Sequence, residues 1–389
     1  MDLRYTEDEE RFRAELRAWL DDVLPTLPPE PDRNDWPARR SYDTAWQRML
    51  FDAGYAGINW PVEYGGRGAS PAQHLIFLEE TERLHAPYVG ANFVGLLHAG
   101  PTLIAEASDE QRARHLPAIL RGDEVWCQGF SEPGAGSDLA SLRTRAVRDG
   151  DDYVVSGQKI WTSHAEVADF CELLVRTDPD APKHRGITWL IMPMDTPGIE
   201  VRPLRTIHGS TEFAELFLDD VRIPVANRVG AENDGWRVAM VTFSFERGTA
   251  FVSEMLQSME LLRALAKFAT ETGRDDVGVR RELGHLAADL DALWALTKRN
   301  VSQAARTGVP GVGGSVFKLH YSEVRQRLGE LSMRVLERAG LSIADIDGIA
   351  NGALVYGQIH ALSLTIAAGT SQIQRNIVGE RVLGLPKDR

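Results

Sequence analysis

The sequence predicts an α+β multidomain protein in which a helical domain, a β domain and a second helical domain follow one another. Apolar residues recur at helical spacing in the first third and again after Trp236, and short β-rich segments separated by turns lie between. The predicted domains are 1–123 (all-α), 124–233 (β) and 234–389 (α-helical). Domains of this size lie within the usual range of about 50–250 residues.

Helix-start signals mark the first domain. Thr6-Glu7-Asp8-Glu9 has the pattern of a capping box, in which the threonine hydroxyl and the third following glutamate satisfy free backbone amides. Phe12, Leu16 and Leu20 then recur on one helical face. Further helix starts are expected at Ser70-Pro71 and at Ser108–Gln111.

The period changes in the middle of the chain. Short segments rich in β-branched and aromatic residues are separated by Asp, Gly and Pro turns, and Asp149-Gly150-Asp151-Asp152 has the composition of a tight hairpin. The expected strands include Tyr153–Val155, Cys171–Val175, Ile187–Met192 and Glu215–Leu218. Long helical runs return at Met255–Phe268, Leu283–Leu296 and Val316–Leu336, with an interruption at Gly308–Gly314.

Composition and charge exclude several protein classes. The formal net charge of −13 disfavours nucleic acid as a partner, because duplex binding relies on basic patches. No apolar run approaches the roughly 20 residues of a membrane-spanning helix, and the N-terminus lacks signal-peptide and transit-peptide patterns. A cytoplasmic protein without membrane contact is therefore expected. Two cysteines and scattered histidines lack any ligand spacing, so no metal site is expected.

Small residues are most concentrated in Cys127–Ser141. Three glycines, a proline and three serines in this stretch predict a loop rather than a regular helix or a central strand. Such a loop exposes backbone N–H groups and small hydroxyls, which a phosphate or a flat heterocycle can approach closely. The stretch carries neither the Gly-x-Gly-x-x-Gly dinucleotide fingerprint nor the Gly-Lys-Ser/Thr of a P-loop.

Four stretches in order along the chain resemble signatures of the acyl-CoA dehydrogenase family. They resemble, in turn, the family's flavin-contacting signature, its flavin-stacking strand, its junction into the last helical domain and its C-terminal cofactor segment. The stretches are Gly129–Asp138, Gly157–Ser163, Asn227–Trp236 and Gly369–Asn376, the last followed by Glu380–Gly384. The resemblance implies FAD as cofactor, a barrel-like middle domain and a C-terminal four-helix bundle.

The resemblance also implies a reaction. An acyl-CoA thioester, or an acyl group on a carrier protein, is desaturated to the trans-2-enoyl thioester. A carboxylate removes the α proton, a hydride leaves the β carbon for flavin N5, and hydrogen bonds on the thioester carbonyl stabilise enolate-like charge. Electrons then pass to an electron-transfer flavoprotein.

The position of the base departs from the commonest family pattern. Many members carry a glutamate directly before the Gly-Thr-Ser-Gln segment, where this chain has Ala368. A minority, of which isovaleryl-CoA dehydrogenase is one, carry it on the first long C-terminal helix before an arginine, and this chain has Phe243–Arg247 there. We therefore expect Glu246 to be the base; the alternative is a solvated helix glutamate. The residues expected at the substrate are Ser137, Ser244, Arg247, Ala368 and Gly369.

Flavin contacts are implied for several segments. Ser131 would contact the pyrimidine end of the ring, and Trp161 would pack against the isoalloxazine, the alternative being a core tryptophan. The resemblance leaves the register between Thr162 and Ser163 open. Arg281, with Arg280 as the alternative, resembles an arginine that reaches the FAD of a neighbouring subunit. The full expected set is Gln128, Phe130, Ser131, Gly136, Ser137, Trp161, Thr162, Ser163, Arg281, Thr370, Ser371 and Gln372.

A second departure concerns the adenine end of the cofactor. Many members carry a Gly-Gly-x-Gly turn that the corresponding stretch, Glu337–Ile343, does not show. The resemblance implies a tetramer, either of identical chains or with a related, non-identical subunit, as in some actinobacterial steroid side-chain dehydrogenases. Two other functions stay open from the sequence: a flavin oxidase or monooxygenase on the same fold, and a non-catalytic subunit of a hetero-oligomeric dehydrogenase.

Overall fold

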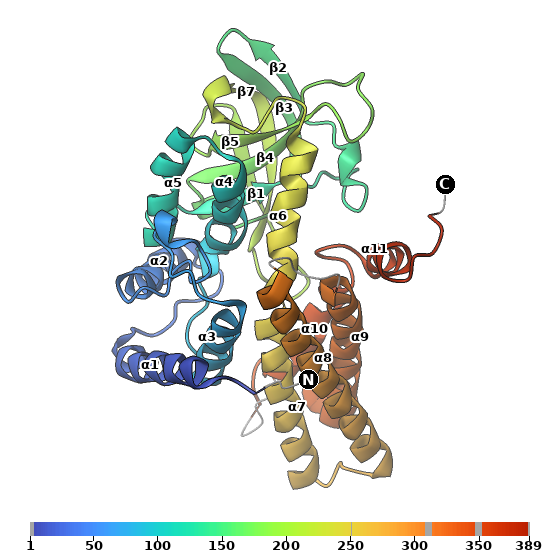
Figure 1. Cartoon of the computed structure of the whole chain (residues 1–389). Helices are drawn as coiled ribbons and strands as arrows, with labels where there is room; N and C mark the ends of the chain where they lie inside the picture. Colours follow the sequence, from blue (N-terminus) through green and yellow to red (C-terminus); the bar gives the residue numbers. More distant parts are fainter. Residues whose placement is uncertain (1–3, 250, 308–312, 347–351, 388–389) are drawn as a thin grey trace. The chain divides into compact units, whose positions relative to one another are not determined.

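The structure is a computed structural model that describes residues 4–249, 251–307, 313–346 and 352–387, without the side chains of 245–249 and 307. It divides into two compact units (Figure 1). The first comprises Met1–Val23, Ser70–Ala86 and Arg247–Arg389, and the second comprises Leu24–Ala69 and Pro87–Glu246. The N-terminal domain predicted from the sequence thus contributes to both units, and the predicted domain boundaries stay a prediction.

The first unit is helical. Its helices are α1 (Glu7–Val23), α3 (Pro71–Arg83), α7 (Val252–Glu271), α8 (Val277–Thr307), α9 (Gly313–Leu336), α10 (Gly352–Leu364) and α11 (Ser371–Ile377). Helices α7 to α10 pack around a common apolar core that includes Leu265, Leu290 and Leu328 (Figure 1). They form the C-terminal bundle that the resemblance implies. Helix α1 packs on α3, which contacts α7 and α8.

The predicted helix starts are confirmed by their hydrogen bonds. The Thr6 amide donates to the Glu9 carboxylate at 2.7 Å, and the Glu9 amide donates to the Thr6 hydroxyl at 3.3 Å. The starts at Ser70 and Ser108 are also capping boxes, each closed by a glutamine three residues later.

The second unit contains the sheet, whose strands follow the order β6-β7-β3-β2-β4-β5-β8, with β1 paired to β4. The strands are β1 (Trp126–Gly129), β2 (Arg145–Asp149), β3 (Asp152–Ser163), β4 (Phe170–Arg176), β5 (Ile187–Pro193), β6 (Ile199–Leu204), β7 (Phe213–Pro224) and β8 (Arg228–Val229). The helices are α2 (Trp36–Asp52), α4 (Gly100–Glu106), α5 (Asp109–Arg121) and α6 (Gly235–Thr249), whose last residues, from Arg247, fall in the first unit. Asp149 pairs with Asp152, so the predicted hairpin joins β2 to β3.

The apolar core of the second unit lies against one face of the sheet. Val155, Leu173, Leu190 and Leu216 are fully buried in this core, which determines which face of each strand points inward.

No helix in the described ranges combines the length and the apolar character needed to cross a membrane.

Candidate active site

The predicted flavin-stacking strand is the end of β3. The register of β3 against β7 shifts between Lys159 and Thr162, and Trp161 within this bulge has a φ of +63°. Trp161 is 56% exposed, and its ring meets the Phe213 ring edge-on at 5.8 Å between centroids. Trp161 is therefore a surface aromatic rather than a core tryptophan, as a residue that stacks on a flat ligand requires.

The next residue, Thr162, carries an unsatisfied polar group. Its side chain is fully buried, and its hydroxyl has no hydrogen-bond partner in the described part of the chain. Leaving a buried hydroxyl unpaired costs about 1–3 kcal/mol. Ser163 is only half-buried. Thr162 therefore faces the interior and Ser163 is the more accessible of the two, and the contact near the reactive end of the ring stays a prediction for either residue.

A buried ion pair holds the loop that follows β1. The Glu132 carboxylate accepts hydrogen bonds from the Lys159 ammonium at 2.9 Å and from the amides of Arg143 and Thr144 at 2.6 and 2.8 Å. Burial alone raises the pKa of Glu132, but these donors, led by Lys159, outweigh it and hold the pKa below its ordinary value. Burial lowers the pKa of Lys159, and the Glu132 carboxylate opposes that shift. The sequence analysis missed this pair.

The same lysine fixes the backbone of the flavin signature. The Lys159 ammonium also donates to the Phe130 carbonyl at 3.2 Å. The Ile160 amide donates to the Ser131 carbonyl at 3.0 Å. Phe130 and Ser131 are thereby hydrogen-bonded to β3 immediately before Trp161, so two of the predicted flavin stretches lie side by side.

Farther along, the loop is open to a ligand. A Cβ atom added at Gly134 or Gly136 would meet nothing within 4 Å, and Ser137 next to them is exposed. Gln128, by contrast, is engaged within the sheet, because its side-chain amide donates to Glu172 at 2.8 Å. Its predicted contribution to cofactor binding is therefore left to its backbone.

Helix α6 starts against this sheet. A Cβ at Gly235 would lie 2.5 Å from the backbone carbon of Thr188, so only glycine permits this approach. The Thr242 hydroxyl lies 2.9 Å from that of Thr102 in α4, and both side chains are fully buried. One position on, the Phe243 ring meets Phe130 edge-on at 5.9 Å. Phe243 therefore links α6 to the flavin loop.

The predicted base lies one turn farther along the helix. Glu246 follows Phe243 by three residues within α6, and the side chains of Glu246 and Arg247 lie outside the described residues. Ser244 is exposed, and its hydroxyl donates to the Val241 carbonyl of its own helix at 2.7 Å. The substrate contact expected of Ser244 stays a prediction.

In the first unit, the segment before α11 has an unusual backbone. Ala368 and Gly369 have φ values of +50° and +87°. The Ala368 carbonyl accepts from the Gln374 side-chain amide at 3.0 Å, and the Gly369 carbonyl accepts from the Lys318 ammonium at 2.6 Å. Because each peptide is trans, the N–H groups of Gly369 and Thr370 point away from these two side chains. Sequence reasoning missed both Lys318 and Gln374.

The three polar residues that follow have different roles. The Thr370 hydroxyl caps α11 by accepting from the Ile373 amide at 3.2 Å. Gln372 is exposed. Ser371 is buried, and its hydroxyl has no partner among the residues that the structure describes. Of the three, Ser371 has the hydroxyl that most needs an external partner.

The two arginines at the start of α8 have different surroundings. Arg280 forms an ion pair with Asp275 at 2.9 Å. Arg281 is exposed and forms no ion pair with any described residue. The contact of Arg281, or alternatively Arg280, with the FAD of a neighbouring subunit stays a prediction.

Lys318 gives a pH-dependent prediction. Burial lowers its pKa from 10.5 to about 8. Between these values the unfolded chain holds the proton and the folded chain does not, so the free energy of unfolding rises with pH in this window. We expect that rise in the wild type to be smaller in Lys318→Met, measured by urea unfolding from pH 7.5 to 10. The variant Lys267→Met, at an exposed lysine, should keep the wild-type dependence of the free energy of unfolding on pH. Equal slopes in all three proteins would show that the lowered pKa of Lys318 is not the cause of the rise.

This fold and site define a flavin-dependent acyl-CoA dehydrogenase, and the chain belongs to that family. The family's N-terminal, middle and C-terminal domains match residues 6–123, 127–221 and 233–383. The membership confirms the predicted family, the fold class and FAD as the cofactor of an oxidoreductase.

Particular relatives cover the whole chain. It is 39% identical to the acyl-CoA dehydrogenase IpdE1 of Mycobacterium tuberculosis, over 98% of this chain and 99% of the relative. It resembles the solved ChsE4–ChsE5 complex from Mycobacterium tuberculosis, with 35% identity and a TM-score of 0.86 over 100% of both chains. It also resembles a structure named Tcur3481-Tcur3483 steroid ACAD, with 32% identity and a TM-score of 0.86 over 100% of both chains.

The residues present fit FAD. The second unit offers an exposed aromatic ring at Trp161, a half-buried serine close by at Ser163 and an exposed glycine loop at Gly134–Gly136. A flat heterocycle with hydrogen-bonding edges matches the first two features, and a phosphate matches the third.

Proposed function

We propose that this chain removes hydrogen from the α and β carbons of an acyl-CoA thioester, with Glu246 as the base, and releases the trans-2-enoyl thioester. The observation that carries the proposal is the contact between the rings of Phe130 and Phe243, whose centroids are 5.9 Å apart. This contact joins the flavin loop to α6, the helix that contains Glu246. Ala368, where many family members carry the base, has no proton-accepting side chain.

Each of these residues has a separate role in the proposed reaction. The Glu246 carboxylate takes the α proton, and the negative charge then develops on the thioester carbonyl oxygen. By the family resemblance, a backbone N–H of the segment that contains Ala368 and Gly369 would donate to that oxygen. FAD, when bound, supplies the acceptor for the hydride that leaves the β carbon. Trp161, with Thr162 or Ser163, would hold and orient the ring.

We further propose a steroid-derived acyl group, a related partner subunit and an electron-transfer flavoprotein as acceptor. The similar structures support the first two, because one is named a steroid ACAD and both are named for two chains. The missing Gly-Gly-x-Gly turn in Glu337–Ile343 also supports a partner that completes the adenine end of the site. A heterotetramer satisfies these observations better than a homotetramer.

The test is anaerobic incubation of the yellow protein with a panel of CoA thioesters. The panel should include cholan-24-oyl-CoA, octanoyl-CoA and isovaleryl-CoA, with the protein alone and co-purified with a related subunit. We expect the steroid thioester to bleach the flavin fastest and to yield, by mass spectrometry, a product that lacks two hydrogen atoms.

Two results would contradict the proposal. Rapid oxygen consumption in air, without an added electron acceptor, would identify an oxidase or monooxygenase. A colourless protein that stays inert to every thioester, alone and with the partner, would identify a non-catalytic subunit.

A further inference from the structure

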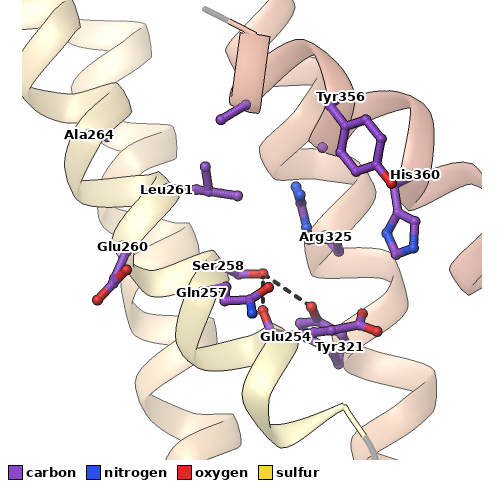
Figure 2. Close-up of a pocket in the computed structure, with 12 residues that line it drawn as sticks. Glu254, Gln257, Ser258, Glu260, Leu261, Ala264, Tyr321, Arg325, Tyr356 and His360 are labelled. Carbon is purple, nitrogen blue, oxygen red and sulfur yellow. Dashed lines mark hydrogen bonds between the residues drawn. The ribbon is translucent and has the colours of Figure 1, made fainter. Parts of the chain in front are cut away.

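A cavity of about 540 Å³ lies within the first unit, between α7, α9 and α10 (Figure 2). Pockets that hold small organic ligands have volumes of about 300–1,000 Å³, mostly apolar walls and a few placed polar groups. This cavity has both kinds of wall. Leu261 and the Tyr356 ring provide apolar surface, and Arg325, Tyr321 and Ser258 provide polar groups.

Arg325 is the unusual member of this lining. It is only 7% exposed, and no carboxylate of the described residues lies within ion-pair range of it. Figure 2 shows its guanidinium projecting into the space between α7 and α10. A buried charge without a partner is strongly destabilising, because its lost hydration is not replaced. The guanidinium is thus a buried positive charge at the cavity wall that no carboxylate of the described residues contacts, although Glu254 and Glu260 also line the cavity.

The neighbour of this guanidinium is neutral. Burial raises the pKa of Tyr321, and the Glu254 charge adds to the rise, while the Ser258 hydroxyl and Arg325 oppose it. The Tyr321 hydroxyl lies 3.1 Å from the Ser258 hydroxyl. Tyr321 therefore offers hydrogen bonding at the edge of the cavity but no negative charge to balance Arg325.

The Arg325 guanidinium packs against helix α10 at a glycine. A Cβ atom at Gly357 would lie 2.3 Å from Nη2 of Arg325, so the arginine lies directly against the glycine backbone. The glycine leaves room for the cation at the cavity wall. The inference below rests on this buried arginine, on its packing against the Gly357 backbone and on the partly open cavity beside it.

The other charges in the lining restrict the ligand. Glu254 and Glu260 also border the cavity and would repel an anion with several charges. A single carboxylate satisfies the guanidinium through two parallel hydrogen bonds, and a phosphate would face more repulsion. The apolar walls favour a hydrocarbon body behind that carboxylate.

We propose that this cavity binds a monocarboxylate with a compact apolar body, whose carboxylate pairs with Arg325 and whose body packs between Leu261 and Tyr356. The site lies within the first unit and the inference does not rest on the proposed function.

The test is calorimetric titration of the FAD-loaded protein with adamantane-1-carboxylate, using adamantane-1-carboxamide and inorganic phosphate as comparisons. We expect Arg325→Gln to weaken carboxylate binding about 10- to 100-fold, because a bidentate bond to a charged group is lost. Wild-type protein should bind the neutral amide less tightly by a similar factor. Phosphate should not bind.

Further variants separate binding from folding. Gly357→Ala keeps the positive charge but displaces the guanidinium, and Ala264→Phe narrows the cavity on the α7 side, so both should weaken binding. Arg327→Gln, two residues along α9 at an exposed arginine paired with Asp289 at 2.7 Å, should bind as the wild type does. Thermal melting identifies any variant that fails to fold.

Three outcomes would overturn the proposal. The first is wild-type protein that binds the carboxylate and the amide equally or binds neither. The second is unchanged affinity in folded Arg325→Gln and Gly357→Ala proteins. The third is absence of binding together with a smaller assembly of Arg325→Gln in sedimentation, which would assign the arginine to a carboxylate of a neighbouring subunit.

Discussion

Replacing Glu246 by glutamine slows anaerobic flavin reduction by about 10²–10⁴-fold, because an amide of nearly the same shape cannot accept the α proton. FAD content and folding stay at wild-type values, since the flavin loop is anchored through Glu132 and Lys159 rather than through position 246. The measurement is stopped-flow bleaching of the visible flavin absorption after mixing with the best thioester. The rate constant at saturating substrate reports the chemical step.

A matched control tests whether the loss of any glutamate charge slows flavin reduction. Glu271→Gln removes an exposed glutamate near the end of α7, where it contacts only Lys267 at 3.8 Å among the described ion pairs. That variant should reduce its flavin at the wild-type rate. If Glu246→Gln does the same, the base lies elsewhere in the chain.

The second large effect is on stability. Glu132→Gln should lower the free energy of unfolding by about 3–5 kcal/mol, because it leaves the Lys159 ammonium buried without a counter-charge. Lys159 has no exposed surface, and Glu132 is 9% exposed. Urea unfolding at neutral pH measures the change, and the FAD content of the folded protein shows whether Phe130 and Ser131 have kept their positions.

Two comparisons sharpen this second prediction. The double variant Glu132→Gln/Lys159→Met should recover part of the lost stability, since it removes the uncompensated charge as well. Glu200→Gln, which breaks an exposed pair with Arg202, should change little. If Glu132→Gln is no more harmful than Glu200→Gln, the buried pair does not hold the loop.

The pH dependence of the Glu132 effect has a definite sign. The folded pKa of this carboxyl lies below its ordinary value, so its stabilising contribution is present above the unfolded pKa and is lost as the pH falls through the folded pKa. The stability difference between wild type and Glu132→Gln should therefore narrow in acid.

Local rules predicted much of the fold. The helix starts at Thr6, Ser70 and Ser108 and the Asp149–Asp152 hairpin depend on residues within a few positions of one another, and the structure contains all four. The assignment of position 246 came from family resemblance and not from the physics of the sequence. It stays a prediction, because that side chain lies outside the described residues.

Long-range partners could not be predicted from the sequence. Glu132 and Lys159 are 27 residues apart, and only the placement of the loop beside β3 makes them an ion pair. The exposure of Trp161 depends on a register shift against β7, about 50 residues later in the chain. The Lys318 contact with Gly369 spans 51 residues. Each depends on tertiary packing, which composition and periodicity do not specify.

The most direct test of the central claim moves the base between the two positions that the family uses. The flavin-bleaching rate should be measured for wild type, Glu246→Gln and the double variant Glu246→Gln/Ala368→Glu, with the same thioester and without oxygen. We predict that the single variant is slow and that the double variant regains part of the rate, because a carboxylate again accepts the α proton. A single variant that bleaches as fast as the wild type would contradict the assignment of Glu246.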